Sequence, residues 1–168
     1  MELKMDRKVK TIGVLTSGGD APGMNAAIRA VCRAGLAAGL RVMGIRRGYQ
    51  GLLNGDIFEM SVRSVSEIIH KGGTCLFTAR CEEFRYIEGV KRGAERCREF
   101  GIDGIVVIGG DGSFRGAADL SAEGIMCIGI PGTIDNDIGA SDYTIGYDTA
   151  LNTIIDMVDR IRDTSQSH

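Results

Sequence analysis

The sequence of 168 residues is poor in several residue types, and each scarcity excludes a class of protein. It has no tryptophan, two prolines and two histidines, and His70 and His168 are too few and too far apart for a histidine-based metal cluster or catalytic triad. No run approaches the ~18 apolar residues of a membrane span, and the first residues lack the apolar core of a signal peptide. We therefore expect a cytoplasmic protein with no membrane partner.

Charge and cysteine content exclude two further classes. Twenty basic and 22 acidic residues leave a net charge of −2, whereas a domain that binds nucleic acid by bulk electrostatics is usually strongly basic. The five cysteines form no CxxC pair: Cys32, Cys75, Cys81, Cys97 and Cys127. We expect these cysteines to be reduced and to serve in packing, with neither a metal site nor a disulfide framework. The length predicts one domain of ordinary size.

Glycine is abundant instead. The chain has 25 glycines in 168 residues, about twice the average usage of ~7%. Proline and glycine together number 27 of 168 residues, about 16%, which is below the roughly 25–30% typical of disordered chains. The surplus glycines are therefore expected where the backbone turns tightly or approaches another group closely.

Short apolar runs alternate with longer amphipathic ones, which predicts an α/β fold. We expect a three-layer sandwich whose mostly parallel, Rossmann-like sheet is covered by helices. The predicted strands are residues 11–16, 42–45, 105–108 and 127–130, with a small one at 74–78. The predicted helices are residues 24–38, 64–69, 84–100, 113–124 and 148–162. Residues 48–55 are expected to form a glycine-rich loop, and Ser64 with Glu67 a capping box.

Three loops that follow predicted strands combine glycine with aspartate, at residues 17–20, 109–113 and 132–137. Loops at the carboxyl ends of parallel strands share one edge of the sheet, where ligands bind. Glycine-rich backbone at a helix N-terminus can hold a phosphate, but nearby carboxylates repel it unless a cation intervenes. The pattern therefore favours a phosphate–Mg²⁺ site, and the alternative for each loop is turn chemistry and helix capping.

Two familiar nucleotide motifs are absent. Residues 18–23 have the spacing of a P-loop, but Met24 and Asn25 stand where its Lys and Ser or Thr belong. No predicted strand is followed by G-x-G-x-x-G, which disfavours a dinucleotide site.

The residues nevertheless resemble a known family. The runs GVLTSGGDAPGMN at 13–25, GGDGS at 109–113 and PGTIDND at 131–137 look like the N-terminal half of bacterial ATP-dependent 6-phosphofructokinase. The resemblance extends to residues 72–74, 79–80 and 160–164. It implies a glycolytic kinase, a transferase that moves the γ-phosphoryl group of ATP to the 1-hydroxyl of fructose 6-phosphate with Mg²⁺ as cofactor.

The resemblance also implies residue roles. ATP would contact Gly19, Arg80, Cys81, Gly110, Asp111, Gly112 and Ser113, with Asp111 as the metal ligand. Fructose 6-phosphate would contact Thr133, Ile134 and Asp135. The implied catalytic residues are Thr133, Asp135 and Asp137, with Asp135 as the base. The alternative for Arg80 is a surface salt bridge with Glu82 or Glu83, and for Asp135 a turn-capping role.

The phosphate donor is expected to be ATP rather than pyrophosphate. The pyrophosphate-using branch of the family carries Asp at the position of Gly112 and Lys at that of Gly132. We expect both glycines to leave the space of the nucleotide α-phosphate empty.

A second set of residues suggests regulation. In the resembled enzymes, arginines at the positions of Arg29, Arg33 and Arg162 bind ADP or phosphoenolpyruvate between the subunits of a homotetramer. Arg63 and Glu67 would join them, although Val62 stands where the family usually has Arg. The alternative for Arg29 and Arg33, which share one face of a helix, is a solvated surface.

Family subunits are about twice this length. We interpret residues 1–168 as the ATP-binding N-terminal domain, with residues 146–168 leading towards a second domain, and expect the isolated chain to be inactive and to expose a core face. The alternatives are a non-catalytic nucleotide-binding fragment and a pyrophosphate-dependent phosphofructokinase.

Overall fold

The computed structural model describes residues 9–139 and 141–168. Its elements in chain order are β1 (Thr11–Thr16), α1 (Met24–Ala37), β2 (Arg41–Ile45), α2 (Gly48–Asn54), β3 (Ile57–Glu59), the 3-10 helices η1 (Val62–Val65) and η2 (Glu82–Arg85), α3 (Ile87–Glu99), β4 (Gly104–Gly109), α4 (Asp111–Ala122), β5 (Met126–Pro131) and α5 (Tyr147–Ser167).

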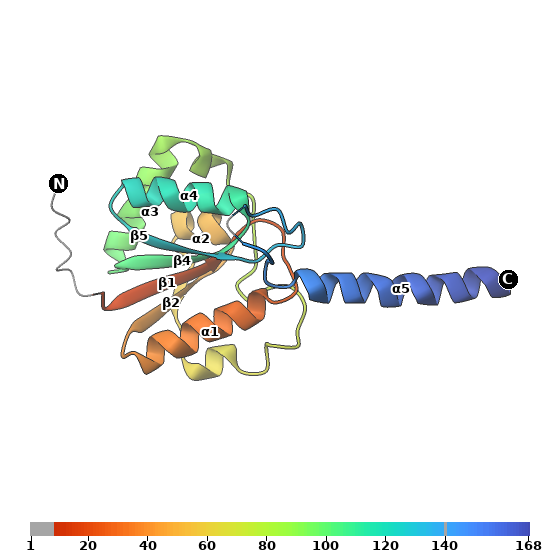
Figure 1. Cartoon of the computed structure of the whole chain (residues 1–168). Coiled ribbons are helices and arrows are strands. Elements are labelled where there is room, and N and C mark those ends of the chain that lie inside the picture. Colours follow the sequence, from red (N-terminus) through yellow and green to blue (C-terminus); the bar gives the residue numbers. More distant parts are fainter. Residues whose placement is uncertain (1–8, 140) are drawn as a thin grey trace.

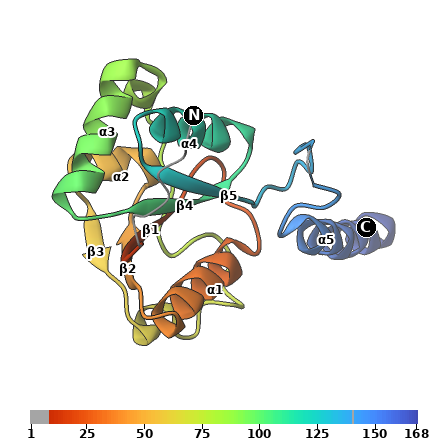
Figure 2. The same ribbon diagram turned by 60° about the vertical axis from the view of Figure 1, so that its left-hand side comes forward.

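The described strands form one twisted sheet in the order β3-β2-β1-β4-β5. Neighbouring strands run parallel except for β2 and β3, which are antiparallel. Helix α1 covers one face, and α2, α3 and α4 cover the other (Figure 1, and from a second side in Figure 2). The predicted three-layer α/β fold with a mostly parallel sheet is confirmed.

Apolar side chains pack on both faces of the central strands. On β1, Val14 joins the core beneath α1, whereas the next residue, Leu15, joins the core beneath α2, α3 and α4. This alternation follows from the two-residue period of a strand. The β-branched run of β4 behaves likewise, since Val107 and Ile108 are fully buried in opposite cores, as expected of a central parallel strand.

The predicted glycine-rich loop at residues 48–55 is wrong, because most of it is helix α2. Tyr49, Leu52 and Leu53 on this helix are buried, so tertiary burial outweighs the poor helix propensity of its glycines. Gly51 allows a close approach, because a Cβ at this position would collide with the carbonyl of Arg46.

Three further expectations about local structure are corrected. Residues 74–78 form no strand but an irregular segment, and the short antiparallel strand β3 was not predicted. The helix expected at 64–69 is instead η1, and its capping box joins Ser61 and Ser64. Glu67, expected to close that box, has a left-handed backbone with φ of 57° and so lies beyond the helix.

Helix α5 extends away from the α/β body (Figures 1 and 2). None of its residues is buried, and its exposed side chains include Leu151, Ile154, Ile155, Met157, Val158 and Ile161. Met126 and Ile128 on the edge strand β5 are also exposed. An uncovered apolar surface was expected from the sequence, and here it lies on α5 and β5. Among the described residues, no helix is long and apolar enough to span a membrane.

Candidate functional site

The site begins where the order of the strands reverses. Strands β1 and β4 are neighbours at the centre of the sheet, and their carboxyl ends carry the first two glycine–aspartate loops. The Ser17 amide donates a hydrogen bond to the Ile108 carbonyl (3.0 Å), which joins the two loops at their base. Gly109 makes the approach possible, because a Cβ there would lie 2.5 Å from the Ser17 carbonyl oxygen. Such a reversal point is the usual ligand crevice of an open α/β sheet.

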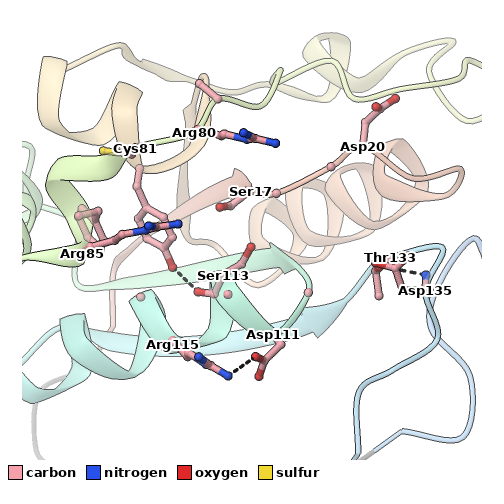
Figure 3. A pocket seen from close by; sticks show the side chains of 18 of the residues that line it. Ser17, Asp20, Arg80, Cys81, Arg85, Asp111, Ser113, Arg115, Thr133 and Asp135 are labelled. Carbon is pink, nitrogen blue, oxygen red and sulfur yellow. Dashed lines mark hydrogen bonds and ion pairs between the residues drawn. The ribbon is translucent and has the colours of Figure 1, made fainter.

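A groove of about 880 Å³ opens at this point, and its walls come from four segments (Figure 3). They are residues 17–20 after β1, residues 79–85, residues 110–119 of the N-cap and body of α4, and residues 133–137 after β5, and Tyr49 of α2 also lines the groove. All residues predicted to contact ATP or sugar, or to act in catalysis, line it: Gly19, Arg80, Cys81, Gly110, Asp111, Gly112, Ser113, Thr133, Ile134, Asp135 and Asp137. The convergence expected from the sequence is therefore present.

The N-terminus of α4 faces the groove. Gly110, the N-cap residue, supplies no side-chain hydrogen bond to the first turn. A Cβ at Gly112 would meet no atom within 4 Å, and the same holds for Gly19 on the opposite loop. Backbone amides at an uncapped helix start are favourable partners for an anion, because the helix dipole is positive there. The geometry suits a phosphate group lying against the main chain.

Tyr49 of α2 contacts the first turn of α4. Its hydroxyl donates a 2.6 Å hydrogen bond to the Ser113 carbonyl, and its ring stacks on Phe84 at 4.1 Å between centroids. Burial raises the pKa of Tyr49 far above its usual range, so the hydroxyl stays protonated and remains a donor. The sequence did not indicate this residue, because residues 48–55 were expected to be a loop.

The third loop is organised by its own polar side chains. The Thr133 hydroxyl accepts from the Asp135 amide (3.2 Å) and donates to the Asp135 carboxylate (3.3 Å). The Asn136 side chain accepts from the Thr144 amide (2.9 Å), and the Thr144 hydroxyl donates to the Thr133 carbonyl (2.6 Å). These contacts order the loop that carries Asp135, and they use only one oxygen of its carboxylate, Oδ2.

Arg80 enters the groove from the side opposite Asp111 (Figure 3). The salt bridge considered for it is not formed, because Glu82 pairs with Arg85 (3.1 Å) and Glu83 with Arg92 (2.6 Å). Among the described residues, Arg80 has no ion-pair partner, so its guanidinium is available to an anionic ligand. Burial raises the pKa of the neighbouring Cys81 thiol.

The groove carries more negative than positive charge. Six carboxylates line it, from Asp20, Glu82, Asp111, Asp119, Asp135 and Asp137, against the three guanidinium groups of Arg80, Arg85 and Arg115. A polyphosphate would be repelled by this excess unless it brought a cation. Among residues 9–139 and 141–168, no cluster of three or more acidic, histidine or cysteine side chains could enclose a metal ion alone. The donor set therefore fits Mg²⁺ held by one or two carboxylates and by ligand phosphates.

Asp111 already has a cationic partner. Its carboxylate lies 2.7 Å from the guanidinium of Arg115, one helical turn further along α4 (Figure 3). Both side chains are mostly exposed, so this pair adds little to stability. The guanidinium of Arg115 does, however, compete with a metal ion for the carboxylate of Asp111. Arg115, Arg85, Phe84 and Asp20 also line the groove but were not among the predicted site residues.

Gly112 and Gly132, the two glycines that bear on the choice between ATP and pyrophosphate as phosphate donor, have different surroundings. Gly112 borders open space, as expected, whereas Gly132 is buried and its missing Cβ would lie 3.2 Å from Ile108 Cγ2. The open surroundings of Gly112 agree with the expectation, whereas the buried position of Gly132 does not test whether it borders the phosphate space. A side chain at this position would require Ile108 to shift by a few tenths of an ångström.

The residues expected to bind effectors lie away from the groove. Arg29 on α1 donates a 2.7 Å hydrogen bond to the Val65 carbonyl of η1. Arg33 on α1, Arg63 on η1 and Glu67, two residues beyond η1, are exposed. Arg162 lies on the projecting α5, where it pairs with Asp159 (2.9 Å), and is not brought together with the others in this chain. Their effector role stays a prediction.

Comparison with known proteins agrees with the geometry. The family model described as Phosphofructokinase matches residues 11–168. The chain is 66% identical over 160 residues to the ATP-dependent 6-phosphofructokinase of Clostridium novyi, and 64% identical over 160 residues to that of Shouchella clausii. Each match covers 95% of this chain and 50% of the relative. Among solved structures, phosphofructokinase from Saccharomyces cerevisiae superimposes with a TM-score of 0.85 and 41% identity, covering 95% of this chain and 25% of that one.

The chain thus spans about half the length of the curated relatives it matches.

Proposed function

The chain belongs to the phosphofructokinase family, and from this we propose that it is the nucleotide-binding half of an ATP-dependent 6-phosphofructokinase. The reaction transfers the γ-phosphoryl group of ATP to the 1-hydroxyl of fructose 6-phosphate. One observation carries the proposal: three glycine–aspartate loops, far apart in the sequence, line one groove at the reversal point of the sheet.

The chemistry needs positioning and charge stabilisation more than covalent catalysis. The phosphates lie against the start of α4, where Gly110, Gly112 and Gly19 leave room beside the backbone. Arg80 approaches from the opposite wall and can bridge two phosphate oxygens with one guanidinium. Cys81 and Ser113 complete the wall beside the nucleotide.

Asp135 is the proposed base. Its carboxylate is exposed at the groove and oriented by Thr133, so it can accept the proton of the attacking sugar hydroxyl. Thr133 and Ile134 contact the sugar phosphate, and Asp137 lies near the transferring group. Asp111, together with the ligand phosphates, would hold Mg²⁺, and the ion would supply positive charge to offset the negative charge of the transferring phosphoryl group.

ATP is preferred over pyrophosphate because of Gly112. The open space at this position accepts the nucleotide α-phosphate, whereas an acidic side chain would repel it. Gly132 gives less support, since its side faces the core.

Regulation, assembly and location complete the proposal on the strength of the family likeness. ADP or phosphoenolpyruvate would bind at Arg29, Arg33, Arg63, Glu67 and Arg162 between the subunits of a homotetramer, in the cytoplasm. Residues 1–168 would form the ATP-binding domain, with α5 leading towards a second domain. The exposed apolar side chains of α5 support this, because such a surface is usually covered.

The test separates binding from catalysis. Calorimetric titration of this chain with Mg–ATP examines the groove alone, and a coupled phosphorylation assay on fructose 6-phosphate examines a chain extended to the length of its relatives. We expect binding by the first, turnover with ATP by the second, and no turnover with pyrophosphate. Turnover by neither donor would refute the kinase assignment, and binding without turnover would favour a non-catalytic nucleotide-binding protein.

A further inference from the structure

An irregular segment, residues 71–81, brings Arg80 to the groove, and we call it the strap. It has no helix or strand of its own, yet it carries Arg80, whose side chain must be placed accurately. Thr16 and Asn25, two buried side chains outside the strap, hold it in position. Neither belongs to the groove lining.

Thr16, at the end of β1, is fully buried and fastens the middle of the strap. Its hydroxyl donates to the Phe77 carbonyl (2.9 Å) and lies 2.9 Å from the Thr74 hydroxyl. A hydroxyl has one proton, so the Thr74 hydroxyl must be the donor in the second contact. Thr74 also accepts from the Leu76 amide (3.2 Å), so each of the two hydroxyls donates one hydrogen bond and accepts one.

Asn25, in the first turn of α1, fastens the beginning of the strap. Its Nδ2 donates to the Lys71 carbonyl (3.1 Å), and its Oδ1 accepts from the Cys75 amide (2.7 Å). Both ends of one buried amide therefore contact the strap four residues apart. A third contact comes from the Arg47 amide, which donates to the Leu76 carbonyl (2.8 Å).

The strap is held in a conformation that it would not adopt freely. Phe77 has a φ of 59°, in the left-handed region that bulky side chains avoid, although the residue is 54% exposed. Such a conformation persists only where surrounding contacts impose it. The Thr16 hydrogen bond ends on the carbonyl of this residue, three positions before Arg80.

We propose that Thr16 and Asn25 are positioning residues, which fix the strap so that Arg80 meets the phosphates of the bound nucleotide. This inference rests on the proposed function, because it assigns Arg80 to a phosphate. The residues act through Arg80, so their effect on nucleotide affinity depends on its presence.

A double-mutant cycle tests this dependence. Affinity for Mg–ATP is measured by calorimetry on the 168-residue chain, for Thr16→Val, Arg80→Met and the double variant. Losing the charged contact of Arg80 should weaken binding by about tenfold or more, and losing the Thr16 hydroxyl by about fivefold. In the Arg80→Met background, Thr16→Val should change affinity by less than about twofold. An equal effect of Thr16→Val in both backgrounds, or no effect in either, overturns the proposal.

Two controls separate positioning from general damage. Thr16→Ser keeps the hydroxyl and should restore affinity, and Thr11→Val, at the other end of the same strand, should leave affinity unchanged. If Thr16→Val does not fold, Thr74→Val removes the partner hydroxyl from the partly exposed strap side and replaces it in the cycle.

Hydrogen exchange keeps the two proposals distinguishable. In Thr16→Val, the amides of Cys75, Leu76 and Phe77 should exchange at least about tenfold faster, while those of β4 keep their protection. Unchanged strap protection overturns the positioning role even if nucleotide binds. Absence of Mg–ATP binding by the unaltered chain refutes the proposed function, and the exchange result then decides whether Thr16 fixes the strap.

Discussion

Gly112→Asp should weaken nucleotide binding about ten- to hundredfold while leaving the fold intact. A Cβ at this position meets nothing within 4 Å, so the new side chain enters open groove without steric cost. Gly112 lies in the first turn of α4, where leaving glycine and adding a negative charge are each favourable. We expect the variant to be about 0.5 kcal/mol more stable than the unaltered chain.

The loss of binding follows from charge. Two unit charges roughly 5 Å apart repel by about 1.5–3 kcal/mol at effective dielectric constants of about 20–40, which corresponds to a ten- to hundredfold weaker affinity for a polyphosphate. Gly112→Asn has nearly the same shape without the charge, and Gly112→Ala has neither the charge nor the bulk.

The assay is calorimetric titration with Mg–ATP, accompanied by thermal unfolding of each variant. The expected order of affinity is glycine, alanine, asparagine and then, by a wide margin, aspartate. Undiminished binding by Gly112→Asp would refute the placement of phosphate at this helix start. Equal losses for Asn and Asp would show that volume, and not charge, excludes the nucleotide.

Three further predictions address the same groove. Arg115→Met removes the cationic partner of Asp111 and should tighten Mn²⁺ binding about twofold in the absence of nucleotide, as measured by electron paramagnetic resonance. The control is Arg160→Met, which breaks the equivalent ion pair with Asp156 on α5 and should leave Mn²⁺ affinity unchanged. Because burial raises the pKa of the Cys81 thiol, its alkylation should be slow at neutral pH and should still accelerate above pH ~9. Bound Mg–ATP should slow the alkylation, and an alkylation rate that does not change with Mg–ATP would contradict the placement of Cys81 in the nucleotide site. Gly109→Ala places a Cβ 2.5 Å from the Ser17 carbonyl oxygen and should cost about 1–3 kcal/mol in thermal unfolding, while Gly19→Ala, in open space, should cost nothing measurable.

Much of the site could be predicted from the sequence because it is built on strand ends. The apolar runs of β1, β4 and β5 identify parallel strands, and parallel strands bring the loops that follow them to one edge. The sequence alone therefore predicts that Gly19, Asp111 and Asp135 meet at one site, and all three line the groove.

The rest depends on tertiary contacts that leave no local pattern. Helix α2 forms because Tyr49 and Leu52 are buried, although its glycines predict a loop. The sequence of the strap predicts a strand at residues 74–78, yet within the described part of the chain its backbone hydrogen-bonds to the side chains of Thr16 and Asn25 and not to a neighbouring strand. Periodicity reports burial along one segment, and it does not report which distant side chain hydrogen-bonds to that segment's backbone.

The pairing of β1 with β4 has a consequence for synthesis of the chain. Strands β1, β2 and β3 emerge first from the ribosome and can pair among themselves, but one side of β1 has no partner until residues 104–109 have been made. During that interval the nascent protein presents a bare, apolar strand edge, the kind of surface on which chains aggregate and chaperones act. Slowing translation before β4 should therefore lower the soluble yield more than slowing it afterwards.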